Sequence, residues 1–182
     1  MTQKLIAAIR RTNRIIALLV GLVLMGSVAL IIAEILLREV GISLGGSEEI
    51  SGYVMAGVAS WGLSFALTEL AHVRIDLIRL KLQERGKAFL DLIAIVALAA
   101  VASIVAIQCW PVLSKTIERG STANTPLETP LWIPQAIWFS GWLWFAVCSC
   151  ALVILTLILL MRRDLEQADT LVGARSELEL ES

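Results

Sequence analysis

The sequence contains four long runs without a charged residue. The two shortest have 19 residues each, and at a helical rise of ~1.5 Å per residue they extend over about 28 Å, close to the thickness of a bilayer's hydrocarbon core. The pattern predicts an all-α integral membrane protein with four transmembrane helices, at about 15–38, 48–70, 90–114 and 134–161. The four runs are Ile15–Ala33, Ile50–Thr68, Leu92–Ser114 and Thr129–Met161.

Around these runs the chain divides into three parts. Residues 1–14 form a basic N-terminus, residues 15–163 the four-helix transmembrane domain, and residues 164–182 an acidic tail. We expect the chain after Met161 to begin as a helix and the acidic end of the tail to be disordered. The first run is longer than the ~7–15 apolar residues of a signal peptide and lacks an A-x-A-like cleavage site, so we expect it to stay in the mature protein. Little sequence is left for a soluble catalytic domain, and a net charge of −1 gives no basis for nucleic-acid binding.

The basic residues are distributed unequally between the two sides of the predicted bundle. Twelve Lys and Arg residues lie in the N-terminus, the segment between the second and third helices and the C-terminus, against three in the two remaining loops. Because cytoplasmic segments retain basic residues, both termini are expected inside the cell. We also expect a belt of amphipathic rings at the outer interface. Its members are Trp110, Trp132, Trp138, Trp142 and Trp144.

The segment between the second and third helices is charged, yet its apolar residues repeat at helical spacing. Ile75, Ile78, Leu82 and Phe89 share one stripe. This predicts an interfacial helix on the inner leaflet at about 73–88, although a cytoplasmic extension of a transmembrane helix stays open as an alternative. The basic residues expected to face the lipid headgroups are Arg79, Lys81, Arg85 and Lys87.

Motifs for catalysis, metal binding or cofactor binding are missing from the sequence. One His cannot supply both axial ligands of a bis-histidine haem. Cys148 and Cys150 form a C-x-C pair inside an apolar run, not the C-x-x-C at a helix start that is typical of thiol oxidoreductases, so we interpret them as small buried packing residues. The sequence therefore predicts no enzyme, no cofactor, no metal site and no substrate site in this chain.

Charged residues at the helix boundaries are the informative polar positions. Glu34 and Arg38 are spaced i,i+4 and can form a local ion pair. Alternatively, Arg38 reaches Glu48 or Glu49 and closes the first hairpin, or Glu34 binds coupling protons, as an intramembrane carboxylate does in small four-helix exporters. At the other end of the second helix, a polar cluster is either a solvated helix end or a subunit contact. It consists of Glu69, His72, Arg74 and Asp76.

Several short segments, in their order along the chain, resemble the small membrane subunit (DctQ-like) of tripartite ATP-independent periplasmic (TRAP) transporters. Leu37-Arg38 ends the first helix and Glu48-Glu49 opens the second, which contains Trp61-Gly62. Residues 71–76 (AHVRID) and residues 125–135 (TPLETPLWIPQ), followed by Trp138 and Gly141, continue the similarity. The resemblance covers about residues 10–163.

The resemblance implies a function in transport. Such small subunits scaffold a large multi-helix membrane subunit in the bacterial inner membrane, which carries the substrate and sodium sites and receives an organic acid from a periplasmic binding protein. The candidate structural or subunit-contact residues are Arg38, Glu48, Glu49, Trp61, Gly62, His72, Arg74 and Asp76. Two alternatives stay open: a self-sufficient exporter that uses Glu34, and an accessory anchor of another membrane complex.

Overall fold

The computed structural model describes residues 2–70 and 82–173 and consists of five helices within these ranges. Four of them are long and apolar enough to cross a membrane, which confirms the prediction of an all-α chain with four candidate spans. A short fifth helix follows them. The helices are α1 (Thr2–Glu39), α2 (Ser47–Thr68), α3 (Glu84–Arg119), α4 (Trp132–Met161) and α5 (Leu165–Val172).

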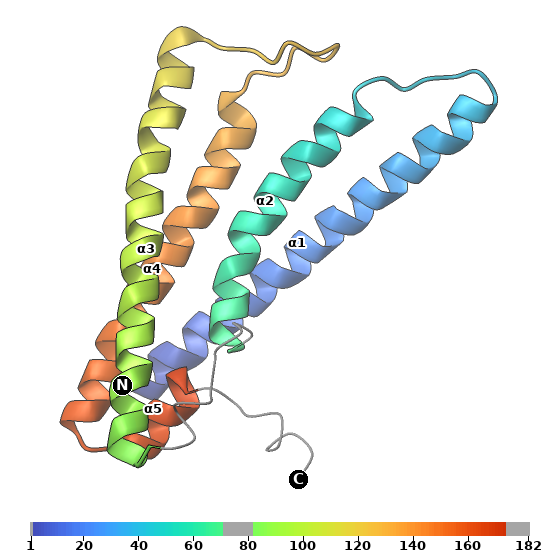
Figure 1. Ribbon diagram of the computed structural model, residues 1–182. Coiled ribbons are helices and arrows are strands. Elements are labelled where there is room, and N and C mark those ends of the chain that lie inside the picture. Colours follow the sequence, from blue (N-terminus) through green and yellow to red (C-terminus); the bar gives the residue numbers. More distant parts are fainter. Residues whose placement is uncertain (1, 71–81, 174–182) are drawn as a thin grey trace.

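The long helices form two pairs (Figure 1). α3 lies along α4, α1 lies along α2, and contacts between α2 and α4 join the pairs. We call the end that holds residues 40–46 and 120–131 the loop end, and the opposite end, with the start of α1 and with α5, the termini end. The two pairs diverge toward the loop end.

The apolar core lies mainly between α3 and α4. Small side chains of α3 allow close approach: Ala99, Ala102 and Ala106 are buried at spacings of 3 and 4, so they share one face of the helix. Large side chains of α4, among them Phe145 and Leu152, are buried as well. In lipid, where water does not drive helices together, such close packing is the main source of association.

Two of the spanning helices are longer than the bilayer requires. α1 has 38 residues, or about 57 Å at ~1.5 Å per residue. Residues 2–14, which we expected to form a separate basic N-terminus, are the first turns of α1. α3 likewise begins at Glu84 and includes the end of the expected interfacial helix, where Lys87 Nζ lies 3.0 Å from Glu84 Oε1. Most of that expected helix, residues 73–81, lies outside the described residues.

The start of the acidic tail forms the short helix α5. The Asp164 side chain accepts a hydrogen bond from the Gln167 backbone N–H at 3.2 Å and so caps α5. Ala168, Leu171 and Val172 are buried and belong to the core cluster, and α5 contacts both α3 and α4. Burial of this apolar face explains why the segment folds. Residues 174–182 lie outside the described residues.

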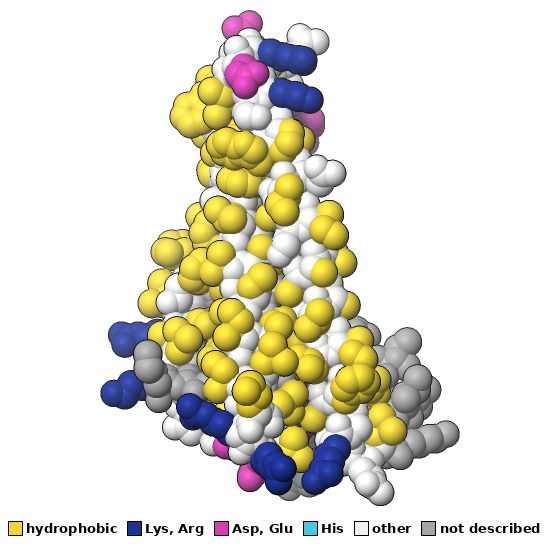
Figure 2. Space-filling view, turned by 90° about the vertical axis from the view of Figure 1, so that its left-hand side faces the viewer, with side chains coloured by type: hydrophobic (Ala, Val, Ile, Leu, Met, Phe, Trp, Pro, Cys, Tyr) yellow, Lys and Arg dark blue, Asp and Glu magenta, His cyan; other side chains and the backbone are white. Residues whose placement is uncertain are grey.

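An apolar surface separates two charged ends (Figure 2). Hydrophobic side chains cover the middle of the face shown there, while Lys and Arg side chains gather at both ends. In the described ranges the loop end has three basic residues, Arg38, Lys115 and Arg119. This arrangement suits a chain that spans a bilayer.

Candidate functional site at the helix contacts

A buried asparagine connects three helices near the termini end. Asn13 of α1 is fully buried. Its Nδ2 donates to the Ser64 carbonyl at 2.9 Å and to the Thr68 hydroxyl at 3.3 Å, both on α2. Its Oδ1 accepts from Trp144 Nε1 on α4 at 2.8 Å. We call these four residues the Asn13 junction.

The Asn13 junction satisfies every strong hydrogen-bonding atom of the asparagine side chain. Trp144 can only donate, so Oδ1 must face it, and the two N–H groups are then directed at α2. A buried amide that loses such partners is costly. The junction therefore fixes the rotation and depth of α1 relative to α2 and α4. The sequence analysis missed it, because Asn13 lies in a basic stretch and nothing in that pattern marks it as buried.

The contact between α2 and α4 depends on a glycine. A Cβ atom added to Gly141 would lie 2.8 Å from Ser60 Cβ and 2.9 Å from the Ser60 backbone carbon. Nearby, Trp61 Nε1 donates to the Ile137 carbonyl at 3.1 Å. Trp61, a predicted contact residue, is thus used within the chain. Its neighbour Gly62 has no atom within 4 Å of where a Cβ would be.

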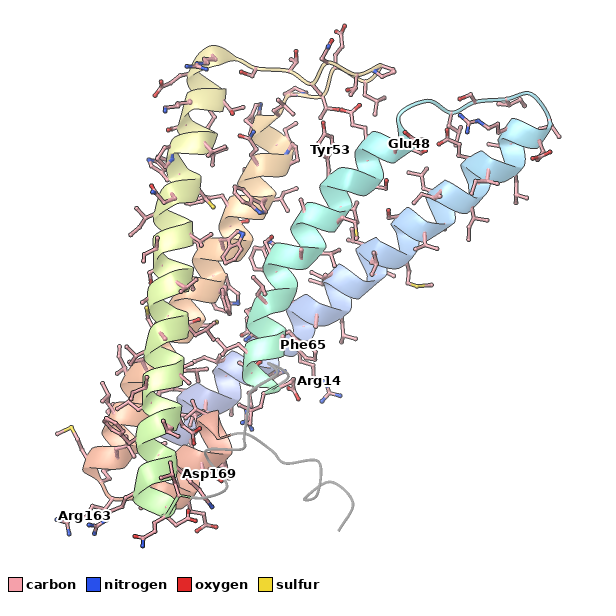
Figure 3. All side chains as sticks on the ribbon, viewed as in Figure 1. Arg14, Glu48, Tyr53, Phe65, Arg163 and Asp169 are labelled. Atoms are coloured by element: carbon pink, nitrogen blue, oxygen red, sulfur yellow. The ribbon has the colours of Figure 1, made fainter. Side chains whose placement is uncertain are left out.

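At the loop end, α2 is held by its own first turn and by the 120–131 loop. The Tyr53 hydroxyl donates to Glu49 Oε1 at 2.7 Å, and the Glu49 carboxylate faces Thr125 and Thr129. Its Oε2 is buried but forms no hydrogen bond among the described residues. Figure 3 shows Tyr53 and Glu48 near this end of α2.

The backbone at this contact requires a glycine as well. Gly46 has a φ of +81°, a left-handed conformation that favours glycine. A Cβ atom here would collide with the side chain of Leu127 in the 120–131 loop. The start of α2 is therefore fitted against that loop, a contact that no sequence motif indicated.

The expected clamp between Arg38 and the glutamate pair is not formed in the described residues. No ion pair joins Arg38 to Glu48 or Glu49 there, and Arg38 and Glu48 are both exposed. Glu49 turns toward Tyr53 and the 120–131 loop instead, because these groups lie on its side of α2. His72, Arg74, Asp76, Arg79 and Lys81 lie outside the described residues.

The five tryptophans of the expected belt have different surroundings. Trp110 and Trp132 are exposed, and Trp110 packs against Phe139 with ring centroids 5.6 Å apart. Trp138 is half-buried. Trp142 packs edge-on against Phe145, and Trp144 belongs to the Asn13 junction. The last two rings thus contribute to packing within the bundle.

Two of the three cysteines agree with their interpretation as small buried packing residues. All three are free, and Cys109 and Cys148 are buried as small side chains. Cys150 is exposed, contrary to expectation. It is two residues from Cys148, so on a helix the two side chains point to different sides.

Four other buried hydroxyls donate hydrogen bonds within their own helices. Ser60, Ser64, Ser149 and Thr156 each donate to a backbone carbonyl three or four residues earlier. Within the described ranges there is no group of three or more His, Cys, Asp or Glu side chains that could hold a metal ion. The polar groups of this interior serve contacts within and between helices.

These features define a class, a polytopic four-helix membrane protein whose buried polar groups hold helices together. Residues 27–166 match the family described as tripartite ATP-independent periplasmic transporters, DctQ component. The match covers more than half of the chain, and the chain belongs to this family. It is a transporter subunit and not an enzyme. No curated protein and no solved structure matches the chain.

Proposed function

We propose that this chain scaffolds the large membrane subunit of a TRAP transporter during sodium-driven uptake of an organic acid, which a periplasmic binding protein delivers. The family match over residues 27–166 carries the proposal. The bundle supports it physically. A transporter that moves a substrate-carrying part across the bilayer needs a stationary partner, and the Asn13 junction and the Gly141 contact restrain the helices against one another.

The proposed membrane is the bacterial inner membrane, with the termini end in the cytoplasm. The distribution of basic residues, twelve against three, supports this orientation. We further propose that the basic segment at 74–87 contacts anionic lipids, with each basic residue contributing ~1 kcal/mol at most. Arg38, Glu48 and Glu49 remain proposed contacts to the large subunit.

Reconstitution tests the division of labour. The chain alone in proteoliposomes should move no solute, whereas the chain with its large subunit and binding protein should take up an organic acid under a sodium gradient. Co-purification of the large subunit with this chain is the accompanying binding assay. Co-purification with an unrelated complex only would favour the accessory anchor.

One residue makes the exporter alternative testable in the same assay. Glu34 is half-buried in α1 and its Oε2 is buried without a hydrogen-bond partner in the described part of the chain. Proton-driven transport by the chain alone, abolished by Glu34→Gln and kept by the control Glu39→Gln, would contradict the scaffold function. We expect both variants to support three-component uptake like the parent.

A further inference from the structure

An open apolar groove of about 500 Å³ lies between α1, α2 and α4 toward the loop end. Its floor is one face of α2 from Ile50 to Trp61, at the spacings of 3 and 4 that place side chains on one side of a helix. Ile16–Val23 of α1 form one wall, and Ile133–Ile137 of α4 form the other.

The length of the groove corresponds to one leaflet of a bilayer. From Ile50 to Trp61, α2 rises about 16 Å at ~1.5 Å per residue, and half of a ~30 Å hydrocarbon core is about 15 Å. The groove begins one turn below the start of α2 at Ser47. It therefore extends from near the membrane surface at the loop end to about the middle of the bilayer.

The extent of the groove distinguishes between two kinds of occupant. Its lining ends at Trp61 and Ile137, near the middle of the bilayer. A membrane-crossing helix of a partner protein would continue past this point, whereas one acyl chain spans a single leaflet and ends there. The groove therefore fits an acyl chain over its full length.

The lining residues indicate how an amphiphile would be oriented in the groove. Most of the groove is formed by Ile, Leu and Val side chains. Polar groups come at the loop end, where Tyr53 and Thr129 line it beside the Glu49 carboxylate. At the deep end, the Trp61 N–H already donates to the Ile137 carbonyl. An amphiphile fits with its headgroup at Tyr53 and its tail toward Trp61.

We propose that this groove is a specific binding site for one acyl chain of a phospholipid in the leaflet at the loop end. An acyl chain there fills a gap between the two helix pairs and holds α1 at a fixed distance from α4. The inference concerns the chain's own lipid contacts and does not depend on the transport function proposed above.

Photo-cross-linking tests the site directly. The full chain, alone and co-reconstituted with its large subunit, is placed in phosphatidylethanolamine and phosphatidylglycerol vesicles containing a phosphatidylcholine with a diazirine near the end of one acyl chain. Peptide mass spectrometry then locates the adducts. We expect groove residues such as Val58 to be labelled at least about threefold more than exposed Leu22 or Ile104, a preference worth ~0.7 kcal/mol.

Equal labelling of groove and control residues would mean that only exchanging lipid is present, and the proposal would be wrong. Loss of groove labelling when the large subunit is added would assign the groove to that protein and overturn the proposal too. Labelling that persists in both preparations supports the lipid site.

A variant that fills the groove provides the second test. Val54→Trp places a ring on its floor, while Val101→Trp adds the same ring to an exposed position of α3 outside it. We expect Val54→Trp to lower groove labelling at least about threefold and Val101→Trp to leave it unchanged, with both proteins showing parental helix content. Unchanged labelling in a folded Val54→Trp protein would contradict the proposal.

Discussion

The two helix pairs differ in how much of their apolar surface the chain itself covers. In the most apolar 18 residues of α4 and α3, 44% and 28% are buried, against 22% in α2 and 6% in α1. The α3–α4 pair also carries α5 against its termini end. The first pair is attached to the second through the Asn13 junction, through the contact of α2 with α4 and at the start of α1, where Ile6 and Ile9 pack against the core cluster.

This difference has a physical explanation in the membrane. In water, a helix as uncovered as α1 would be unstable, but in lipid the exposed Leu18, Leu22 and Met25 side chains lose nothing by facing acyl chains. Helices there are held by close packing and buried polar bonds. Close packing holds the α3–α4 pair together, and buried hydrogen bonds attach α1. The surface of α1 is therefore available to lipid or to a partner subunit.

The largest expected effect comes from separating the two pairs at Gly141. Gly141→Val places side-chain atoms where Ser60 and its backbone already lie, and the backbone cannot yield as a flexible side chain can. We expect a loss of about 3 kcal/mol in the free energy of unfolding, measured by unfolding in detergent. Gly62→Ala is the control and should be within ~0.5 kcal/mol of the parent. A stable Gly141→Val protein would show that α2 and α4 are not in tight contact.

A matched pair of leucines tests the contrast in packing. Leu152 of α4 is 3% exposed and Leu22 of α1 is 71% exposed. Leu152→Ala leaves a cavity and should cost about 2 kcal/mol in unfolding free energy, whereas Leu22→Ala should cost less than ~0.5 kcal/mol. Equal losses in the same detergent assay would remove the distinction between the two pairs.

The sequence was sufficient to predict helices that depend only on the residues of their own segment. The uncharged runs indicated all four spans, because length and lack of charge suffice for that. The extension of α1 to Thr2 escaped prediction because its first turns carry charges. For α5, a helical start of the tail was expected after Met161, but its bounds were not predicted, although Asp164 and the apolar spacing from Leu165 to Val172 indicate a capped amphipathic helix there.

Contacts between distant segments could not be derived in this way. Gly46 lies in the loop between the first two helices, but its fit against Leu127 depends on how the 120–131 loop folds over α2. For Glu49, one alternative was a pair with Arg38 across the hairpin. Its hydrogen bond with Tyr53 is local, one turn along the same helix, but the approach of Thr125 and Thr129 to the same carboxylate depends on the fold of the 120–131 loop.

Asn13 tests the polar attachment of α1. Asn13→Leu leaves the Trp144 N–H without its acceptor and should cost about 1 kcal/mol, a typical value for a hydrogen bond between membrane helices. The exposed neighbour Thr12 supplies the control, Thr12→Ala. In a double-mutant cycle with Trp144→Phe, the second change should cost less once Asn13 is gone. Additive losses would show that the two side chains do not interact.

The smallest effects on stability are expected at the loop end of the first pair, at Tyr53 and Arg38. Variants of these two residues distinguish an effect on stability from an effect on assembly. Tyr53→Phe removes the hydrogen bond to Glu49 and should cost about 1 kcal/mol in unfolding free energy. Arg38→Ala should change it by less than ~0.5 kcal/mol, because Arg38 is exposed and has no ion pair with Glu48 or Glu49 in the described structure.

In an assembly assay with the large subunit, we expect Arg38→Ala to have a larger effect than Tyr53→Phe. If Arg38 is a subunit contact, Arg38→Ala weakens co-purification of the large subunit while the isolated chain stays as stable as the parent. Tyr53→Phe would then lower the stability of the isolated chain but leave co-purification of the large subunit unchanged. A marked loss of stability in isolated Arg38→Ala would instead reveal a partner for Arg38 within the chain, and a parental result in both assays would place Arg38 among the lipid-exposed residues of α1.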